Sequence, residues 1–152
     1  MIALPVFGDK SHIGIDRRYG FIRGQAVTSA SAPDGRLLKS VINTDNTSGE
    51  VWADSAYRSQ SNEKWLAAKM LVSRIHRKKP KGKPMPKATA QANARKSSIR
   101  AHVEHVFAHR KNRYGLFIRT IGIKRAEAKL TLANLAYNMD RLIFHERRAA
   151  TL

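Results

Sequence analysis

A single carboxylate lies in the most basic part of this sequence, and its neighbours indicate which chemistry it could support. Between Trp65 and Ala126 the chain contains seventeen lysines or arginines and one acid, Glu104. Arg100 lies four residues before this acid, and Lys111 lies seven residues after it. Hard divalent cations prefer carboxylate ligands, and arginine and lysine side chains bind phosphate groups. The three residues are therefore a candidate site for metal-dependent chemistry on a phosphate ester.

A long helix is expected to carry these three side chains. Residues 88–114 contain no proline or glycine and are rich in good helix formers. At about 100° per residue, Arg100, Glu104 and Lys111 fall within roughly 40° of one another on one face. An apolar stripe beside that face should pack on a core, and it comprises Ile99, Val103, Val106, Phe107 and Tyr114.

The polar face of this helix has two interpretations. Arg100 and Glu104 have the spacing of an ordinary surface salt bridge, which would contribute roughly a few tenths of a kcal/mol. However, solvated faces usually mix charges of both signs, and this stretch has no second acid. The absence of other acids favours a functional role for Glu104.

Three motifs resemble those of one enzyme family. Arg100, Glu104 and Lys111, with three and six residues between them, resemble the signature around the last acidic residue of DDE transposases from bacterial insertion sequences. Residues 51–59, VWADSAYRS, are similar to the strand that carries the second catalytic aspartate of that family, here Asp54. Residues 132–142, LANLAYNMDRL, are similar to its final helix.

The order and spacing of these motifs cover nearly the whole chain and indicate the IS4/IS5-like group. One position departs from the pattern, because the family often has a tyrosine where this chain has Ser97. The resemblance implies an α/β, RNase H-like fold, in which a mixed sheet carries helices on both faces.

The resemblance also implies a function, which is DNA transposition. Its parts are the binding of transposon ends, metal-dependent phosphodiester hydrolysis and strand transfer. Asp54 and Glu104 would be catalytic residues and ligands of Mg²⁺ or Mn²⁺. Two such ions, about 3.5–4 Å apart, neutralise charge on the attacking and leaving oxygens of a phosphodiester. Arg100 and Lys111 would be catalytic residues that hold phosphates beside the metal.

No first catalytic aspartate is identified, although such a site normally needs at least three carboxylates. In the family that residue lies on a strand before the predicted hairpin. The only acids of this chain near that place are Asp9 and Asp16. Asp16 has the position of a turn or cap residue, and the context of Asp9 does not match either. We therefore expect the C-terminal part of a transposase catalytic domain, without its first strand, from a truncated or split gene. A second copy or an upstream transposase fragment would be a further partner.

Length and charge agree with a protein that binds nucleic acid. The 152 residues suit one domain over 1–152, and a hydrophobic content of 42% is typical of globular chains. The net charge of +18 favours a polyanionic partner, here double-stranded DNA; an anionic membrane surface is the alternative. No stretch has the length of a membrane span, and no signal peptide is apparent. Because the chain also has no cysteine, we expect a bacterial cytoplasmic, nucleoid-associated protein.

Residues 77–87, RKKPKGKPMPK, are the strongest candidate for direct contact with the DNA backbone. Three prolines and a glycine favour a flexible loop at this place. Its cations would follow the phosphates without reading the bases, and they are Arg77, Lys78, Lys79, Lys81, Lys83 and Lys87.

The first half of the chain has the pattern of short strands and turns. We expect a hairpin over residues 12–32, with its turn at residues 19–20. A turn signal precedes a short helix over residues 36–42, and a polar loop follows over residues 43–50.

The second half has the pattern of strands alternating with helices. A strand over residues 51–53 leads to Asp54, a helix capped by Ser59 follows, and residues 70–75 form a buried strand. Residues 116–123 are an irregular link after the long helix. The last helix, residues 124–147, should pack on the sheet through Leu132, Leu135, Ala136, Met139, Leu142 and Ile143.

Other interpretations stay open. His102, His105 and His109 share one face of the long helix and could bind zinc, contact phosphate or simply face solvent. Trp52, beside Asp54, is either a core residue or part of the site. The alternative function is a non-catalytic basic nucleic-acid-binding protein, in which the two acids only balance charge.

Overall fold

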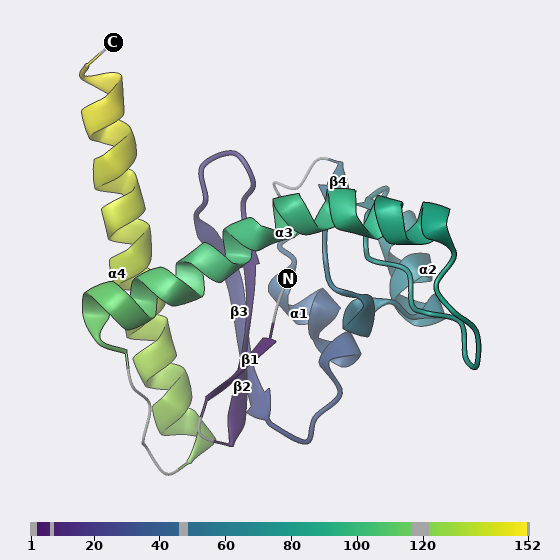
Figure 1. Cartoon of the computed structure of the whole chain (residues 1–152). Coiled ribbons are helices and arrows are strands. Elements are labelled where there is room, and N and C mark those ends of the chain that lie inside the picture. Colours follow the sequence, from purple (N-terminus) through teal and green to yellow (C-terminus); the bar gives the residue numbers. More distant parts are fainter. Residues whose placement is uncertain (1–2, 7, 46–48, 117–121, 152) are drawn as a thin grey trace.

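The chain forms a mixed α/β structure, in which a long helix crosses two small sheets (Figure 1). The computed structural model describes residues 3–6, 8–45, 49–116 and 122–151, with the backbone alone for residues 3–6. Its elements are β1 (Ala3–Val6), β2 (Asp9–Ile15), β3 (Ile22–Ser29), η1 (Asp34–Leu37), α1 (Leu38–Val41), β4 (Glu50–Val51), η2 (Ser55–Tyr57), α2 (Gln60–Ala68), β5 (Val72–Ser73), α3 (Lys87–Tyr114) and α4 (Ile123–Ala149). No helix within these ranges is long and apolar enough to cross a membrane.

The predicted hairpin is confirmed as β2 and β3, which pair antiparallel. Asp16 shapes its turn, because its carboxylate accepts the backbone N–H groups of Arg18, at 3.1 Å, and Tyr19, at 2.6 Å. Gly20 then takes a φ of 76°, which favours glycine. Asp16 is thus a turn residue, as its position indicated. The sequence analysis missed β1, which pairs antiparallel with the first half of β2.

Two glycines let the first helix lie directly on this hairpin. Gly14 and Gly24 are cross-strand partners, and a Cβ atom at either would collide with the carbonyl oxygen of Val41. The predicted helix over residues 36–42 is divided, since the 3-10 turn η1 precedes the four residues of α1. The close approach buries one side of α1 against the strands.

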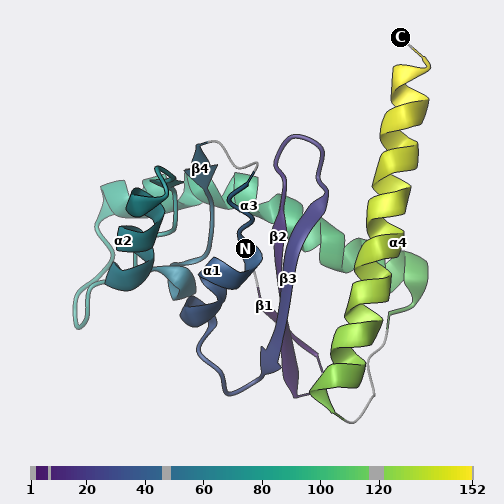
Figure 2. The ribbon, with the colours of Figure 1, turned by 180° about the vertical axis from the view of Figure 1, so that it is seen from behind.

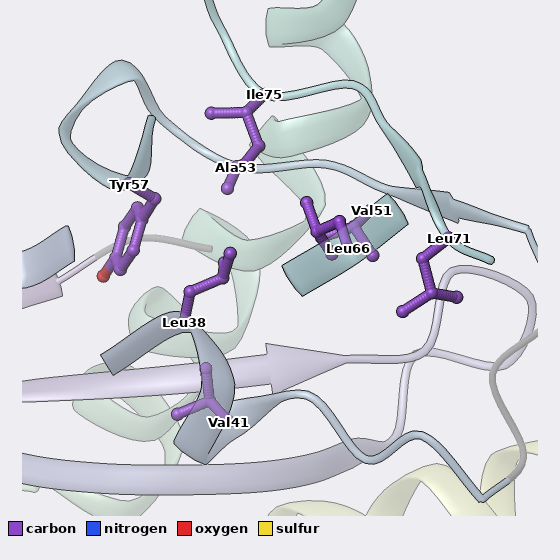
Figure 3. Close-up of a cluster of buried hydrophobic side chains, with 8 residues drawn as sticks. All are labelled: Leu38, Val41, Val51, Ala53, Tyr57, Leu66, Leu71 and Ile75. Atoms are coloured by element: carbon purple, nitrogen blue, oxygen red, sulfur yellow. The ribbon is translucent and has the colours of Figure 1, made fainter. Parts of the chain in front are cut away.

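The second sheet consists of β4 and β5, which pair parallel. With α1 and α2 it encloses a core cluster, drawn in Figure 3, that comprises Leu38, Val41, Val51, Ala53, Tyr57, Leu66, Leu71 and Ile75. Ser59 caps α2 as predicted, because its hydroxyl oxygen accepts the N–H of Asn62 at 3.1 Å. The predicted strand over residues 70–75 is shorter than expected and only partly buried, with Met70 and Val72 exposed.

The described strands form two separate sheets, whereas the resemblance implied one mixed sheet without its first strand. The first sheet is all antiparallel and the second is parallel, and no hydrogen-bonded ladder joins them. Helix α3 runs across both, as Figures 1 and 2 show from opposite sides. It joins the sheets through side chains, since Val103 and Val106 pack with Ile13 and Ile22 of the hairpin. Helix α3 starts one residue before the predicted range and ends at the predicted Tyr114.

The packing of α4 corrects a second prediction. Five of the six residues expected to face inward are exposed, namely Leu132, Leu135, Met139, Leu142 and Ile143. The sixth, Ala136, is half-buried. The buried residues of α4 are instead Ala126, Leu130, Ala133, Asn134 and Tyr137. Beside them, Asn138 bonds both the N–H and the C=O of Ile22, at 2.8 and 2.9 Å. Arg141 donates to the carbonyl oxygen of Tyr19. The apolar members of this buried set recur at helical spacing and form a second stripe, and the hydrogen bonds add to their packing by satisfying the backbone of β3 and of the turn.

Part of the predicted loop over residues 43–50 lies outside the described ranges, namely residues 46–48. The same holds for residues 117–121 of the predicted link over residues 116–123.

Candidate active site

Asp54 follows strand β4 and lies where the chain leaves the core of the second sheet. The alternation of a strand buries Val51 and Ala53, so the next residue begins a turn at the edge of the core. There the Asp54 carboxylate caps η2, and its Oδ1 accepts the N–H of Ser55 at 2.5 Å. Tyr57, at the end of that turn, is buried and shares a 2.8 Å hydrogen bond with His12 of β2. This anchor holds the Asp54 turn against the hairpin.

Arg100 brings the two candidate carboxylates together. Its guanidinium donates to Asp54 Oδ2 at 3.0 Å, and it also pairs with Glu104 Oε1 at 3.4 Å. The Arg100 side chain is 22% exposed, whereas those of Asp54 and Glu104 are 40% and 58% exposed. The Arg100–Glu104 contact also fits the surface pair that the spacing suggested. The long-range contact to Asp54 is what the spacing did not reveal.

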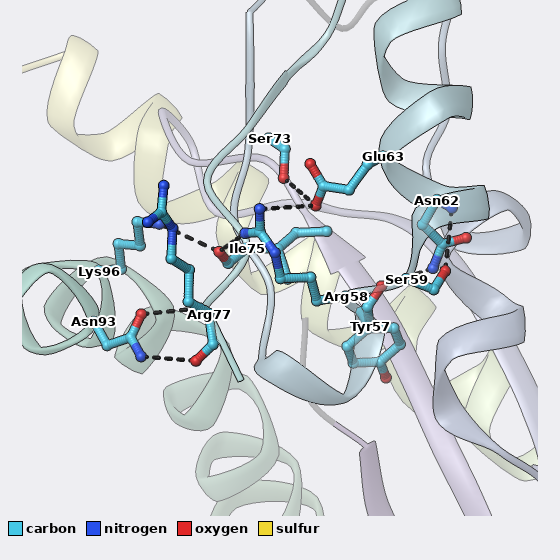
Figure 4. A network of polar contacts seen from close by, with 10 residues as sticks. All are labelled: Tyr57, Arg58, Ser59, Asn62, Glu63, Ser73, Ile75, Arg77, Asn93 and Lys96. Carbon is cyan, nitrogen blue, oxygen red and sulfur yellow. Dashed lines mark hydrogen bonds and ion pairs between the residues drawn. The ribbon is translucent and has the colours of Figure 1, made fainter. Parts of the chain in front are cut away.

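A polar network fixes α3 relative to the second sheet, as Figure 4 shows. The carbonyl oxygen of Ile75 accepts hydrogen bonds from Arg58, at 2.9 Å, and from Lys96 of α3, at 3.2 Å. One turn earlier on the helix, Asn93 makes two backbone hydrogen bonds to Arg77, both at 3.0 Å. Because Arg100 lies one turn after Lys96, this network sets the position from which it reaches Asp54.

His76 is a residue near the site that the sequence analysis did not select. It is buried, and its backbone N–H donates to the carbonyl oxygen of Ala53. Burial lowers the pKa of His76, the nearby Arg100 lowers it further, and Asp54 opposes the shift. This shift favours the neutral ring beside Arg100. The position of His76 directly after the strand predicted over residues 70–75 was the only signal available in the sequence.

A cavity of about 390 Å³ adjoins Arg100. It lies between the end of β2, strand β4 and the middle of α3. Its charged lining consists of four arginines, Arg17, Arg18, Arg23 and Arg100, and two acids, Asp16 and Glu50. Trp52 also lines it, with the guanidinium of Arg17 5.6 Å from the centre of its ring. The half-buried Trp52 is thus part of the cavity wall as well as of the strand end.

The remaining candidate cations lie apart from this centre. Lys111 is exposed two helical turns beyond Glu104, about 10 Å along the axis. The six loop cations are also exposed, and Lys87 is the first residue of α3. Neither Lys111 nor these six forms an ion pair within the described ranges.

The three helix histidines do not act together. His109 faces α4, where its Nε2 lies 3.3 Å from a carboxylate oxygen of Asp140. His102 lines the cavity, and its ring centre is 6.3 Å from that of His105. Within the described part of the chain, no three histidine or acidic side chains form a group that could hold a metal ion.

Comparison with known protein families decides the broader identity. A family model described as the transposase DDE domain matches residues 6–139. The chain belongs to this family. The matched range contains Asp54, Arg100, Glu104 and Lys111, so the resemblance seen in the motifs is confirmed at the level of the family. Its role is in DNA transposition, the recombination that moves insertion sequences and other transposable elements. No solved structure matches the chain.

For a DDE transposase domain, the donor set fits a divalent metal only in part. Asp54 and Glu104 supply carboxylate oxygens, which suit Mg²⁺ or Mn²⁺. The guanidinium of Arg100 contacts both of them, and no third acidic side chain joins the pair within the described residues. The geometry therefore brings two carboxylates to one guanidinium.

Proposed function

We propose that this chain, as one domain, carries two of the three carboxylates of a transposase active site. The observation that supports this proposal most directly is the contact of one guanidinium with both Asp54 and Glu104, which lie fifty residues apart in sequence. A positive group that bridges two acids occupies the kind of place that a metal ion takes between such ligands. Both carboxylate side chains are more exposed than that of Arg100, so they are accessible to metal and to DNA.

The residues around these acids then have separate roles. Asp54 and Glu104 hold Mg²⁺ or Mn²⁺, which neutralises the charge that develops on the phosphodiester oxygens. Arg100 turns from the carboxylates to a phosphate of the bound strand, and Lys111 binds a phosphate further along the helix. The exposed cations of residues 77–87 follow the backbone of double-stranded DNA at the transposon ends and target.

The third carboxylate comes from an upstream segment of the transposase. Two features support this part: among the residues that the structure describes, no third acid joins Asp54 and Glu104 in a metal-binding group, and a cavity separates the end of β2 from β4. A strand inserted between these edges would join the antiparallel and parallel sheets into one RNase H-like mixed sheet. The chain is then the C-terminal part of an IS4/IS5-like catalytic domain in a bacterial cell.

Calorimetric titration with Mg²⁺ and Mn²⁺ tests the role of the acids. The wild type should bind metal weakly, Glu104→Gln should lose that binding, and Glu127→Gln, an exposed acid on α4, should retain it. Equal binding by all three proteins would contradict the assignment of Glu104. Absence of binding in all three would mean that the site does not assemble in this chain alone and would favour the non-catalytic DNA-binding function.

Repeating the titration with the upstream segment added tests the third ligand. Metal affinity should rise, and Mg²⁺-dependent cleavage of DNA should appear. A folded, soluble protein that contains this segment and gains neither property would overturn the proposal.

A further inference from the structure

The turn that carries the Asp54 carboxylate has little secondary structure of its own. Strand β4 before it has two residues, and the 3-10 turn η2 after it has three. Within the turn, the carboxylate accepts the N–H of Ser55 at 2.5 Å, and the carbonyl oxygen of Asp54 accepts the N–H of Tyr57 at 3.1 Å. A segment with so few backbone hydrogen bonds opens easily unless side chains hold it. The direction of the carboxylate therefore depends on the contacts of the turn with its neighbours.

One side chain of the turn reaches the hairpin. Tyr57 is 1% exposed, and its hydroxyl oxygen lies 2.8 Å from Nδ1 of His12, which is fully buried in β2. The other ring nitrogen of His12, Nε2, lies 3.1 Å from the hydroxyl oxygen of Thr28 in β3. The rings of Tyr57 and His12 meet edge to face, with their centres 6.2 Å apart. A single imidazole thus ties the turn to both strands of the hairpin.

The opposite side of the turn is fixed by α2. The amide nitrogen of Asn62 donates to the carbonyl oxygen of Tyr57 at 2.7 Å (Figure 4), and it also donates to that of Gly35 at 2.7 Å. Gly35 lies against the turn, because a Cβ atom at this position would be 2.9 Å from the carbonyl oxygen of Ala56. Tyr57 is therefore held at its backbone by α2 and at its hydroxyl by the hairpin.

The link between Tyr57 and His12 lies in an apolar environment. Tyr57 belongs to the core cluster that includes Leu38 and Ala53, and its hydroxyl points away from these side chains (Figure 3). In such surroundings a hydrogen bond is stronger than in water, and an unpaired hydroxyl or ring nitrogen is costly. The favourable position of the hydroxyl is therefore beside Nδ1 of His12.

We propose that Tyr57 and His12 are positioning residues for Asp54, because their hydrogen bond fixes the turn so that the carboxylate faces Arg100 and the metal. This inference rests on the proposed role of Asp54 as a metal ligand. Such ligands must be held within about 0.5 Å of their productive positions. Loss of a residue that orients a ligand costs about 10–100-fold in metal affinity. Both residues act through the Asp54 turn, without touching the metal.

Hydrogen exchange of the whole chain, followed by NMR, tests the positioning without any metal. Tyr57→Phe removes the hydroxyl and keeps the ring packed. Protection of the Ser55 N–H, relative to that of helix α2, should fall about fivefold, because the turn loses a buried hydrogen bond. Tyr114→Phe is a matched control, since it loses a hydroxyl bond to Asp140 near α4 and should leave Ser55 unchanged. Unchanged protection of Ser55 in Tyr57→Phe would overturn the proposal.

Two substitutions of His12 separate positioning from packing. An asparagine amide can take the place of Nδ1, and a glutamine amide that of Nε2, because each lies the same number of bonds from Cβ. His12→Asn should therefore keep the link to Tyr57, whereas His12→Gln should keep only the link to Thr28. Protection of Ser55 should be retained in His12→Asn and reduced in His12→Gln. Equal loss of protection in both would show that only the packing of the ring matters and would overturn the role of the hydrogen bond.

Calorimetric titration with Mn²⁺ on the same proteins tests the consequence for the site. Tyr57→Phe and His12→Gln should bind Mn²⁺ at least about tenfold more weakly than the wild type. His12→Asn and Tyr114→Phe should keep the wild-type affinity, even where urea denaturation shows them to be less stable. Losses of affinity that simply follow the losses of stability would overturn the proposal. If the wild type does not bind Mn²⁺, the metal role of Asp54 fails, and reduced Ser55 protection in Tyr57→Phe still supports the positioning of the turn.

Discussion

Helix α3 carries two clusters in which carboxylates meet arginine, and they are built in opposite ways. At the α4 end, one acid, Asp140, accepts a hydrogen bond from Tyr114 at 2.5 Å and pairs with Arg113 at 2.8 Å and with His109 at 3.3 Å. Near the middle, one cation, Arg100, is shared by two acids that are more exposed than Asp140. The first cluster directs three donors to one carboxylate oxygen, Asp140 Oδ2, whereas the second has a single donor at each of Asp54 Oδ1, Asp54 Oδ2 and Glu104 Oε1.

The first cluster is therefore a structural site, whereas the carboxylates of the second can accept a further ligand. Asp140 joins α3 to α4, and the hydroxyl hydrogen bond from Tyr114 is the main cause that lowers the pKa of Asp140. Asp54 and Glu104 share one guanidinium across a longer contact to Glu104, so they retain lone pairs for another ligand. Removal of side chains at the first cluster should affect stability, and removal at the second should affect chemistry.

The largest effect should come from Asp54→Asn/Glu104→Gln in a protein that includes the upstream segment. Loss of a partner outside the direct ligands of a metal costs about 10–100-fold in affinity or activity, so loss of two direct ligands should reduce nicking more than about a hundredfold. Affinity for DNA should hold or rise, because two negative charges are removed. Gel assays of nicking and binding measure both properties.

Stability provides the control for this double variant. Its urea midpoint should stay close to that of the wild type, because each substitution keeps the size of the side chain and a carbonyl oxygen that can accept from Ser55 or Arg100. Retention of nicking in the double variant would remove the distinction between the two clusters and support the non-catalytic function.

A smaller effect is expected from Tyr114→Phe at the structural cluster. The variant loses a hydroxyl donor to Asp140 while the ring remains packed, so the free energy of unfolding should fall by about 0.5–1.5 kcal/mol. Urea denaturation followed by circular dichroism measures the change. An unchanged free energy of unfolding would show that this hydrogen bond does not help to hold α4.

The loss of thermal stability at low pH should depend on Asp140. Because the pKa of this carboxyl is lower in the folded chain than its ordinary value of 3.8, its contribution is present above pH 3.8 and is lost as the pH falls through the folded pKa. Asp140→Asn should therefore flatten the fall of the melting temperature at low pH. Thermal melts between about pH 6 and pH 2 test this, and an unchanged slope would contradict the assignment.

The smallest effect should come from Lys111→Gln, between the two clusters. If Lys111 contacts one phosphate, its loss should reduce the slope of log affinity against log salt by about 0.9 and should weaken binding equally for all DNA sequences. Fluorescence anisotropy at several salt concentrations measures the slope. Lys64→Gln on α2 provides a matched exposed lysine for comparison.

Local patterns determined much of this structure in advance. Residues 88–114 form a helix because they lack breakers, and Gly115 ends it in the left-handed conformation with a φ of 56°. Ser59 was recognisable as a cap, and the spacing of Arg100 and Glu104 placed them on one face. These features depend on neighbours within one or two turns, which the sequence displays directly.

Only the tertiary structure determined which residues distant in the sequence contact one another. Periodicity identified an apolar stripe of α4, but the fold buries a different stripe, with Leu130 and Tyr137, together with the Asn138 hydrogen bonds to β3. The contact of Arg100 with Asp54 and the buried pairing of His12 with Tyr57 join residues more than forty positions apart. Such contacts depend on how separate elements satisfy one another's polar groups, and no local pattern contains that information.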